Sequence, residues 1–188
     1  MKIISTYLSG VYIIKRTPST DERGSFSRMF CKNEFKAVGI TTNIAQINLS
    51  VNYKKHTLRG LHYQNDEAAE DKVITCINGE IYDVCVDIRK DSPTFGKWIG
   101  KMLSAENGLS LYIPKGFAHG FLTLKNNCHI IYFMSEFYKP GNSAGFKYDE
   151  PVFSIEWPIK GPFIISEQDR NWEYIKKLGV NNDIFLER

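Results

Sequence analysis

The sequence predicts an all-β barrel or sandwich that ends in a short helix. Apolar and polar residues alternate along several short segments, which is the pattern of strands with one buried face. Residues 43–51 are an example, with Ala45, Ile47, Leu49 and Val51 on one face and polar residues between them. Glycine and proline turns separate these segments, and many short strands joined in this way are typical of sandwiches and barrels.

The strongest turn signal is Asn78-Gly79, which lies between the apolar runs 72–77 and 80–88. Asn-Gly predicts a β-hairpin here, because a two-residue type I′ turn needs positive φ at both central positions. Further strands are expected near residues 11–15, 24–31, 97–104, 109–113, 118–124, 129–138 and 152–157.

Two segments favour helices, near 33–38 and near 167–178, because each is followed by a glycine that can end a helix in the left-handed conformation. The chain has 188 residues, enough for one domain with a sizeable core and short for two, so a single domain is expected over residues 1–188. A barrel leaves edge strands that proteins commonly protect by pairing. The Tyr- and Ile-rich N-terminal strand therefore favours a homodimer.

Composition excludes several classes of protein. The net charge of +3 is too small for a nucleic-acid-binding surface, although mild basicity suits a small anionic ligand. No apolar run is long enough to span a membrane, and the N-terminus lacks the pattern of a signal peptide. Cys31, Cys76, Cys85 and Cys128 are widely spaced, which indicates free thiols in a reducing cytoplasm rather than a disulfide framework.

Four segments must be considered together: DERGSFSRMF at 21–30, TLRGLHYQ at 57–64, DIRKDSPTFGKW at 87–98 and LYIPKGFAHGFLTL at 111–124. In order and spacing they resemble the dTDP-4-dehydrorhamnose 3,5-epimerase family. The resemblance continues through YFMSEFYKP at 132–140, YDEPVFSIEWP at 148–158 and SEQD at 166–169. It covers about residues 5 to 170 and implies a double-stranded β-helix, the jelly-roll barrel of the cupins, with a short C-terminal helix.

The resemblance implies epimerisation at C3, C5 or both of a nucleotide-linked 4-keto-6-deoxyhexose. A ketone at C4 acidifies the hydrogens on C3 and C5, so a proton can be removed from one face and returned from the other. This chemistry needs a base, an acid across the ring and a donor for the enolate oxygen. It needs no redox cofactor, and the sequence has no dinucleotide-binding G-x-G-x-x-G. We expect no cofactor.

Four residues match the family's catalytic positions. His62 matches the base, which suits a neutral imidazole that titrates near physiological pH. Asp169 matches the carboxylate that pairs with this histidine, although Ser166-x-x-Asp169 also resembles a helix-capping box. Lys72 matches the residue near the sugar oxygen, where an ammonium stabilises an enolate. Tyr132 matches the acid on the opposite face, because a phenol holds its proton at neutral pH.

The substrate-binding residues follow from the same resemblance. The positions that meet the diphosphate and the sugar are matched by Arg23, Gln46, Asn48 and Arg59; Phe26 matches an aromatic that packs on the base, and Tyr138 lines the site. Strict alternation would place Arg59 and His62 on opposite faces of their strand. A β-bulge at Gly60 would bring both side chains to one face, so we predict a bulge there.

His119, in GFAHGF, resembles the histidine of the second cupin motif. In metal cupins this residue is a ligand together with an H-x-H pair and a glutamate. Here the pair is His62 and Gln64, and no glutamate stands in a comparable place, so we expect no metal. His119 is then expected to contact substrate or to support the site.

Arg28 departs from the family, most members of which have a carboxylate there, close to the thymine. Arginine can only donate hydrogen bonds, which suits cytosine better than thymine. A CDP-linked sugar and a mono-epimerase therefore remain alternatives to the dTDP-linked substrate of rhamnose biosynthesis. A non-catalytic sugar-nucleotide-binding cupin is a further alternative, and it would tolerate loss of the catalytic residues.

Overall fold

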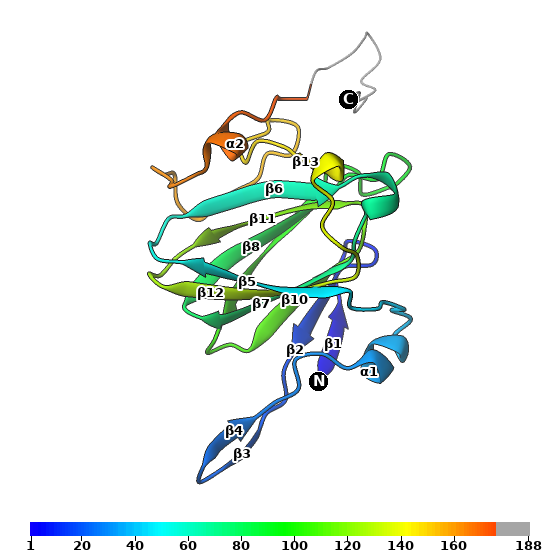
Figure 1. Cartoon of the computed structure of the whole chain (residues 1–188), viewed down its shortest axis with the longest axis vertical. Coiled ribbons are helices and arrows are strands. Elements are labelled where there is room, and N and C mark those ends of the chain that lie inside the picture. Colours follow the sequence, from blue (N-terminus) through cyan, green and yellow to red (C-terminus); the bar gives the residue numbers. More distant parts are fainter. Residues whose placement is uncertain (176–188) are drawn as a thin grey trace.

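The computed structural model describes residues 1–175, whose body is made of two antiparallel β-sheets packed face to face, as Figure 1 shows. The six-stranded sheet has the order β1-β2-β10-β7-β12-β5. Its strands are β1 (Lys2–Ser5), β2 (Tyr12–Lys15), β5 (Gln46–Asn52), β7 (Lys72–Asn78), β10 (Leu109–Ile113) and β12 (Cys128–Met134). The prediction of an all-β fold is confirmed.

The five-stranded sheet has the order β13-β6-β11-β8-β9. Its strands are β6 (Leu58–Gln64), β8 (Glu80–Asp87), β9 (Trp98–Ser104), β11 (Phe117–Thr123) and β13 (Ser143–Gly145). The remaining elements are the hairpin β3 (Ser19–Asp21) and β4 (Gly24–Phe26), the helices α1 (Lys32–Lys36) and α2 (Glu167–Arg170), and the 3-10 turns η1 (Asp66–Ala68) and η2 (Pro140–Asn142).

The main core lies between the two sheets and takes side chains from both of them. Ile74 and Leu111 come from the six-stranded sheet, and Ile81 and Phe121 from the five-stranded sheet; all four are buried. Burial of apolar area on this scale is the main source of stability in such a sandwich. Three of the four cysteines are buried, and all four are free thiols, as predicted.

The predicted hairpin at Asn78-Gly79 is wrong. Strand β7 pairs with β10 and β12, whereas β8 pairs with β9 and β11, so the turn carries the chain from one sheet to the other. Gly79 has a φ of 79° but Asn78 does not have positive φ, which excludes the type I′ turn. A Cβ at Gly79 would lie 2.6 Å from the Cys128 Sγ, so packing selects this glycine.

The strand predicted at 152–157 is also wrong. The backbone N–H groups of Phe153 and Ser154 both donate to the carbonyl oxygen of Glu150, and Ser154 has a φ of 49°. These bonds form a turn, and the irregular chain that follows packs on the outer face of the five-stranded sheet. Local hydrogen bonds and burial of Phe153 therefore prevail over the apolar alternation.

Three other predicted elements are shorter than expected. The strand predicted at 24–31 ends at Phe26, and the strand predicted at 129–138 ends at Met134. The helix predicted at 167–178 ends at Arg170, and further along the chain the backbone N–H of Ile175 donates to the Glu150 carboxylate rather than to a helical carbonyl oxygen. The last residues of that predicted helix, from 176 onward, lie outside the described residues. The helix predicted at 33–38 is present as α1.

The predicted bulge at Gly60 is confirmed. His62 pairs with His119 and Arg59 pairs with Phe121, so two residues of β6 oppose Gly120 of β11. Gly60 has a φ of 113°, and a Cβ there would lie 2.6 Å from the Gly120 Cα. The close approach of the two backbones requires glycine. The extra residue turns the side chains of Arg59 and His62 to the same side of the sheet.

The hairpin β3–β4 projects from the body of the molecule (Figure 1). Among residues 1–175, the sheet edge next to its base is formed by β1, which pairs with β2 alone. Within residues 1–175 the structure contains no helix that is long and apolar enough to cross a membrane.

Candidate active site

A cavity of about 350 Å³ opens between the two sheets. Eight of the residues predicted from the sequence line this cavity: Gln46, Asn48, Arg59, His62, Lys72, His119, Tyr132 and Tyr138. They come from β5, β6, β7, β11 and β12 and from the loop after β12. The fold therefore brings together side chains that are up to 92 positions apart in the sequence.

The two walls of the cavity carry different chemistry. Strands β7 and β12 of the six-stranded sheet supply Lys72 and Tyr132. Strands β6 and β11 of the five-stranded sheet supply His62 and His119. The predicted base and the predicted acid consequently stand on opposite walls.

His62 is paired with the buried Asp169. Its Nε2 lies 2.6 Å from the Asp169 Oδ1, and the other carboxylate oxygen accepts the backbone N–H of Gly60 at 3.1 Å. The backbone N–H of Asp169 donates to the Ser166 Oγ, so helix capping and histidine pairing coexist. Burial would raise the pKa of Asp169, but the hydrogen bond from His62, the charge of His62 and the Gly60 N–H hold this pKa below its usual value.

A second imidazole–carboxylate pair lies beside the first. The His119 Nε2 is 2.7 Å from the Asp83 Oδ1, and Asp83 is fully buried on β8. Burial raises the pKa of the Asp83 carboxyl, against the opposing effects of His119 and Lys72. Asp83 Oδ2 has no hydrogen-bond partner within the described part of the chain. Asp83 was missed from the sequence, although an aspartate inside the apolar run 80–88 is a signal of a functional carboxyl.

Tyr132 stands close to this second pair. Its ring meets the His119 ring edge-on, with 6.1 Å between the centroids. Burial raises the pKa of the Tyr132 phenol, with a further contribution from the charge of Asp83. The phenol therefore keeps its proton at neutral pH and can donate it.

Lys72 is held by a carboxylate from the loop before β7 and by a backbone oxygen of the opposite wall. Its Nζ lies 3.0 Å from the Glu70 Oε1 and 3.4 Å from the backbone oxygen of His62. Glu70 in turn accepts a hydrogen bond from the Gln64 amide. Glu70 was also missed from the sequence, because it stands in a polar loop that carries no motif.

The binding residues that line the cavity are fixed by hydrogen bonds. The Arg59 Nε donates to the Asn52 Oδ1 at 2.8 Å, which orients the guanidinium. The Gln46 Oε1 accepts the backbone N–H of Tyr138 at 3.0 Å and so ties the loop after β12 to β5. The ring of Tyr138 is exposed at the mouth of the cavity.

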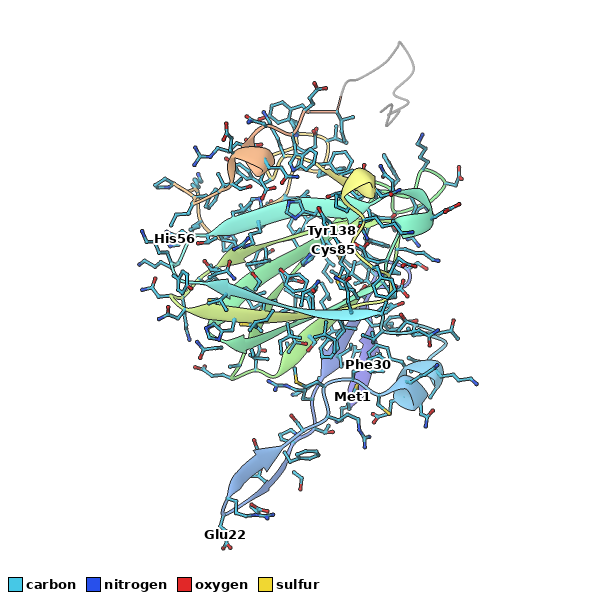
Figure 2. The ribbon with its side chains drawn as sticks, viewed as in Figure 1. Met1, Glu22, Phe30, His56, Cys85 and Tyr138 are labelled. Carbon is cyan, nitrogen blue, oxygen red and sulfur yellow. The ribbon has the colours of Figure 1, made fainter. Side chains whose placement is uncertain are left out.

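Three predicted binding residues do not reach this cavity. Arg23 pairs with Asp21 on the β3–β4 hairpin, and Phe26, on the same hairpin, is 82% exposed. Arg28 forms an ion pair of 2.5 Å with Glu34. Figure 2 shows Glu22 at the tip of the hairpin, below the barrel body on which Tyr138 is labelled. The prediction that these residues share a site with His62 is not met within one chain.

A metal centre is not formed by the side chains of residues 1–175. In this range no group of three or more His, Cys, Asp or Glu side chains is arranged to hold a metal ion.

Comparisons with known proteins agree with one another. The family model described as dTDP-4-dehydrorhamnose 3,5-epimerase matches residues 5–177. A curated relative of that name from Methanothermobacter thermautotrophicus is 42% identical over 187 residues, covering 98% of each chain. The crystal structure of the Bacillus anthracis enzyme with TDP and PPi bound has a TM-score of 0.88 and 37% identity, covering 92% of this chain and 98% of that one. The Legionella pneumophila 3,5-epimerase in complex with dTDP-4-keto-L-rhamnose has the same score and identity, covering 92% of each chain.

Proposed function

We propose a mechanism in which protons pass between the two walls of the cavity. It proceeds from the fact that the chain belongs to the dTDP-4-dehydrorhamnose 3,5-epimerase family. The protein is a sugar-nucleotide epimerase with the double-stranded β-helix fold of the cupins. It inverts C3 and C5 of a dTDP-linked 4-keto-6-deoxyhexose. The observation that carries the mechanism is the placement of His62 and Tyr132 on opposite walls of one cavity.

The first step is removal of the proton on C3 or C5 by His62. Its Nε2 is engaged by Asp169, so Nδ1 is the nitrogen that takes the proton. The carboxylate of Asp169 stabilises the imidazolium that results and fixes the orientation of the ring. A positioned base of this kind contributes about 10²- to 10⁴-fold to the rate.

The second requirement is stabilisation of the enolate oxygen at C4. Lys72 lies in the cavity with a fixed ammonium group, and such a donor acts on charge that develops only in the transition state. Loss of one donor of this kind typically costs about 10²- to 10³-fold in kcat.

Inversion is completed by Tyr132. A sugar ring held between the sheets turns one face to β6 and the other to β12. Return of a proton from Tyr132 therefore reaches the face opposite to the one from which His62 removed it. Arg59, Gln46, Asn48, His119 and Tyr138 surround the same space, which supports their roles in binding the diphosphate and the sugar.

We further propose that the protein is a homodimer in which the hairpin of one chain completes the site of the other. Arg23 and Phe26 match nucleotide-binding positions, yet they are exposed on a hairpin that projects away from its own cavity. Mixed oligomers test this proposal. His62→Ala and Phe26→Ala chains, each inactive alone, are expected to regain activity when unfolded and refolded together; no gain would contradict shared sites.

The nucleotide is proposed to be dTDP rather than CDP. Arg28, the residue that favoured cytosine, is ion-paired with Glu34, and Glu34 also binds the N-terminal ammonium group. This pairing directs the Arg28 Nη1, one of the donors that could face a cytosine, to a carboxylate of the same chain. Calorimetric titration of the free diphosphates is expected to give tighter binding of dTDP; tighter binding of CDP would favour the CDP-linked alternative. The absence of a cofactor and the cytoplasmic location stay predictions from the sequence.

Solvent exchange tests the mechanism directly. The enzyme is incubated with dTDP-4-keto-6-deoxyglucose in D₂O, with and without prior EDTA treatment, and deuterium at C3 and C5 is followed by NMR. The wild type is expected to label both carbons at the same rate in both preparations, and His62→Ala to label neither. Labelling at one carbon would indicate a mono-epimerase. No labelling by the wild type would favour a non-catalytic binding protein.

A further inference from the structure

Glu70 is a buried carboxylate at the cavity for which the epimerase mechanism above gives no role. It is 5% exposed and lines the cavity together with Lys72 and Gln64. One of its oxygens lies 3.0 Å from the Lys72 Nζ, and the other accepts a hydrogen bond from the Gln64 Nε2. Glu70 therefore connects a neutral amide to the ammonium group.

The contacts of Lys72 limit the directions in which its ammonium can act. An ammonium has three N–H donors. One points to Glu70, and a second points to the backbone oxygen of His62 at 3.4 Å. One donor is then left for the substrate. Without Glu70, the four-carbon stem of the lysine would be free to place its charge elsewhere.

Gln64 holds the carboxylate in turn. Its Nε2 also donates to the backbone oxygen of Ala68 at 3.0 Å, and its Oε1 accepts the backbone N–H of Lys139 at 2.7 Å. These bonds fix the amide on both sides. Gln64 occupies the position at which metal cupins have a histidine ligand. Here that position supports a carboxylate that binds a fixed ammonium group.

Stability alone does not explain this arrangement. Removing two charges from water costs free energy that a buried ion pair often fails to recover. In the described part of the chain, the other ionisable side chains at the cavity are His62, His119 and Arg59, the tyrosines Tyr63, Tyr132 and Tyr138, and the carboxyls Asp83 and Asp169 that bind the two histidines. Of these, Asp83 acts on Lys72 at longer range, and Glu70 is the carboxylate in contact with Nζ in the described structure.

We propose that Glu70 is a positioning residue, which orients the ammonium of Lys72 toward the C4 oxygen of the sugar. This inference rests on the proposed role of Lys72 in stabilising the enolate. Such an interaction is made mainly in the transition state, so its loss lowers kcat with little change in KM. Glu70→Gln is expected to lower kcat by about tenfold to a hundredfold, the range of effects seen when a catalytic group is misplaced.

A double-mutant cycle tests whether Glu70 acts through Lys72. The variants are Glu70→Gln, Lys72→Ala and the double variant, with kcat and KM measured for each. If Glu70 acts through Lys72, the double variant is no slower than Lys72→Ala. Equal and additive losses would overturn the proposal, and so would a kcat of Glu70→Gln within twofold of the wild type. Wild-type kcat in Lys72→Ala would instead refute the role of Lys72 itself.

Rescue by an external amine gives a second measurement that a purely structural role would not affect. Ethylammonium is expected to restore part of the kcat of Lys72→Ala with saturation, and not that of the double variant. It is also expected to raise the thermal midpoint of Lys72→Ala, whereas ethanol does not. This comparison decides the proposal even if Glu70→Gln is poorly folded. Equal effects of the two additives would contradict an ammonium-binding carboxylate.

Glu150→Gln is the matched control. Glu150 is also a buried glutamate, but it accepts the backbone N–H groups of Val152 and Ile175 away from the cavity. Its substitution is expected to lower the thermal midpoint and to leave kcat unchanged. A loss of kcat equal to that of Glu70→Gln would show that the loss of any buried carboxylate impairs the enzyme, and would overturn the proposal.

Discussion

His62 and His119 are direct cross-strand partners on β6 and β11, and each uses its Nε2 to bind a carboxylate. The two carboxylates differ in environment. Asp169 has hydrogen bonds to both oxygens and a lowered pKa, whereas Asp83 is fully buried with one oxygen unpartnered among the described residues and a raised pKa. Divergent environments of this kind separate the roles of similar groups in active sites. The ionised Asp169 suits its pair to accept a proton, whereas burial of Asp83 disfavours the ionised form of that carboxyl.

Tyr132→Phe should separate proton removal from inversion. The variant lacks the phenolic proton, but His62 can still remove a proton and return deuterium to the same face. We expect epimer formation to fall by about 10²- to 10⁴-fold, while deuterium entry into recovered substrate continues. NMR of the sugar ring measures both rates. A parallel loss of exchange and inversion would contradict a role for Tyr132 as the opposite-face acid.

Asp169→Asn should affect both activity and the pH dependence of stability. Because its pKa is lowered on folding, ionised Asp169 stabilises the folded protein above the ordinary pKa of about 3.9. This contribution is lost as the pH falls through the lower folded-state pKa. Urea unfolding between pH 2 and pH 6 should show a smaller decline for the variant than for the wild type. At neutral pH, kcat is expected to fall by about 10²- to 10⁴-fold, because the wrong tautomer of His62 is favoured. Superimposable pH curves would show that the carboxylate is not coupled to folding.

Asp83→Asn should lower kcat without lowering the stability of the folded protein. A carboxyl whose pKa is raised by burial destabilises the folded protein in full above its folded-state pKa, and this cost diminishes as the pH falls through that pKa toward the ordinary value. Removing the charge should leave the thermal midpoint at pH 7 unchanged or raise it by about 2–4 °C. Because His119 loses its orienting partner, kcat should fall about tenfold or more. A lower midpoint with unchanged kcat would assign Asp83 a structural role.

Gly60→Ala should disturb the site through the backbone. The new Cβ would lie 2.6 Å from the Gly120 Cα and 2.7 Å from the His119 oxygen, at a φ of 113°. We expect a loss of about 1–3 kcal/mol in the free energy of unfolding, together with a lower kcat as Arg59 and His62 shift. Gly141→Ala is the control, because no atom lies within 4 Å of a Cβ at that position. Equal effects of the two variants in urea unfolding and in kcat would exclude the bulge as the cause.

The sequence predicted the site residues best where a family motif and the local strand conformation indicate the same placement of a side chain. His62, Lys72 and Tyr132 were identified in separate segments, and the cavity contains all three. The bulge at Gly60 followed from the need to place Arg59 and His62 on one face, and the strand register bears it out.

Prediction failed where a residue depends on partners that are distant in the sequence. Asp83 and Glu70 carry no motif, and their importance emerges only from burial beside His119 and Lys72. Asn78-Gly79 has the composition of a hairpin turn, but the sheets on either side decide which strands pair. Arg23 and Phe26 were expected beside His62, because one sequence does not tell which copy of the chain a residue serves.

The strand order has a further consequence for folding. From β5 to β13 the chain changes sheet at every connection but one, so each wall of the cavity is assembled from alternate strands. Such non-local pairing makes folding slow, because long loops must close before the contacts form. It also couples the two walls into one cooperative unit. An intermediate in which the sheet that carries His62 is ordered and the sheet that carries Tyr132 is disordered is therefore disfavoured. Enzymatic activity and the folded state should disappear together in a single transition.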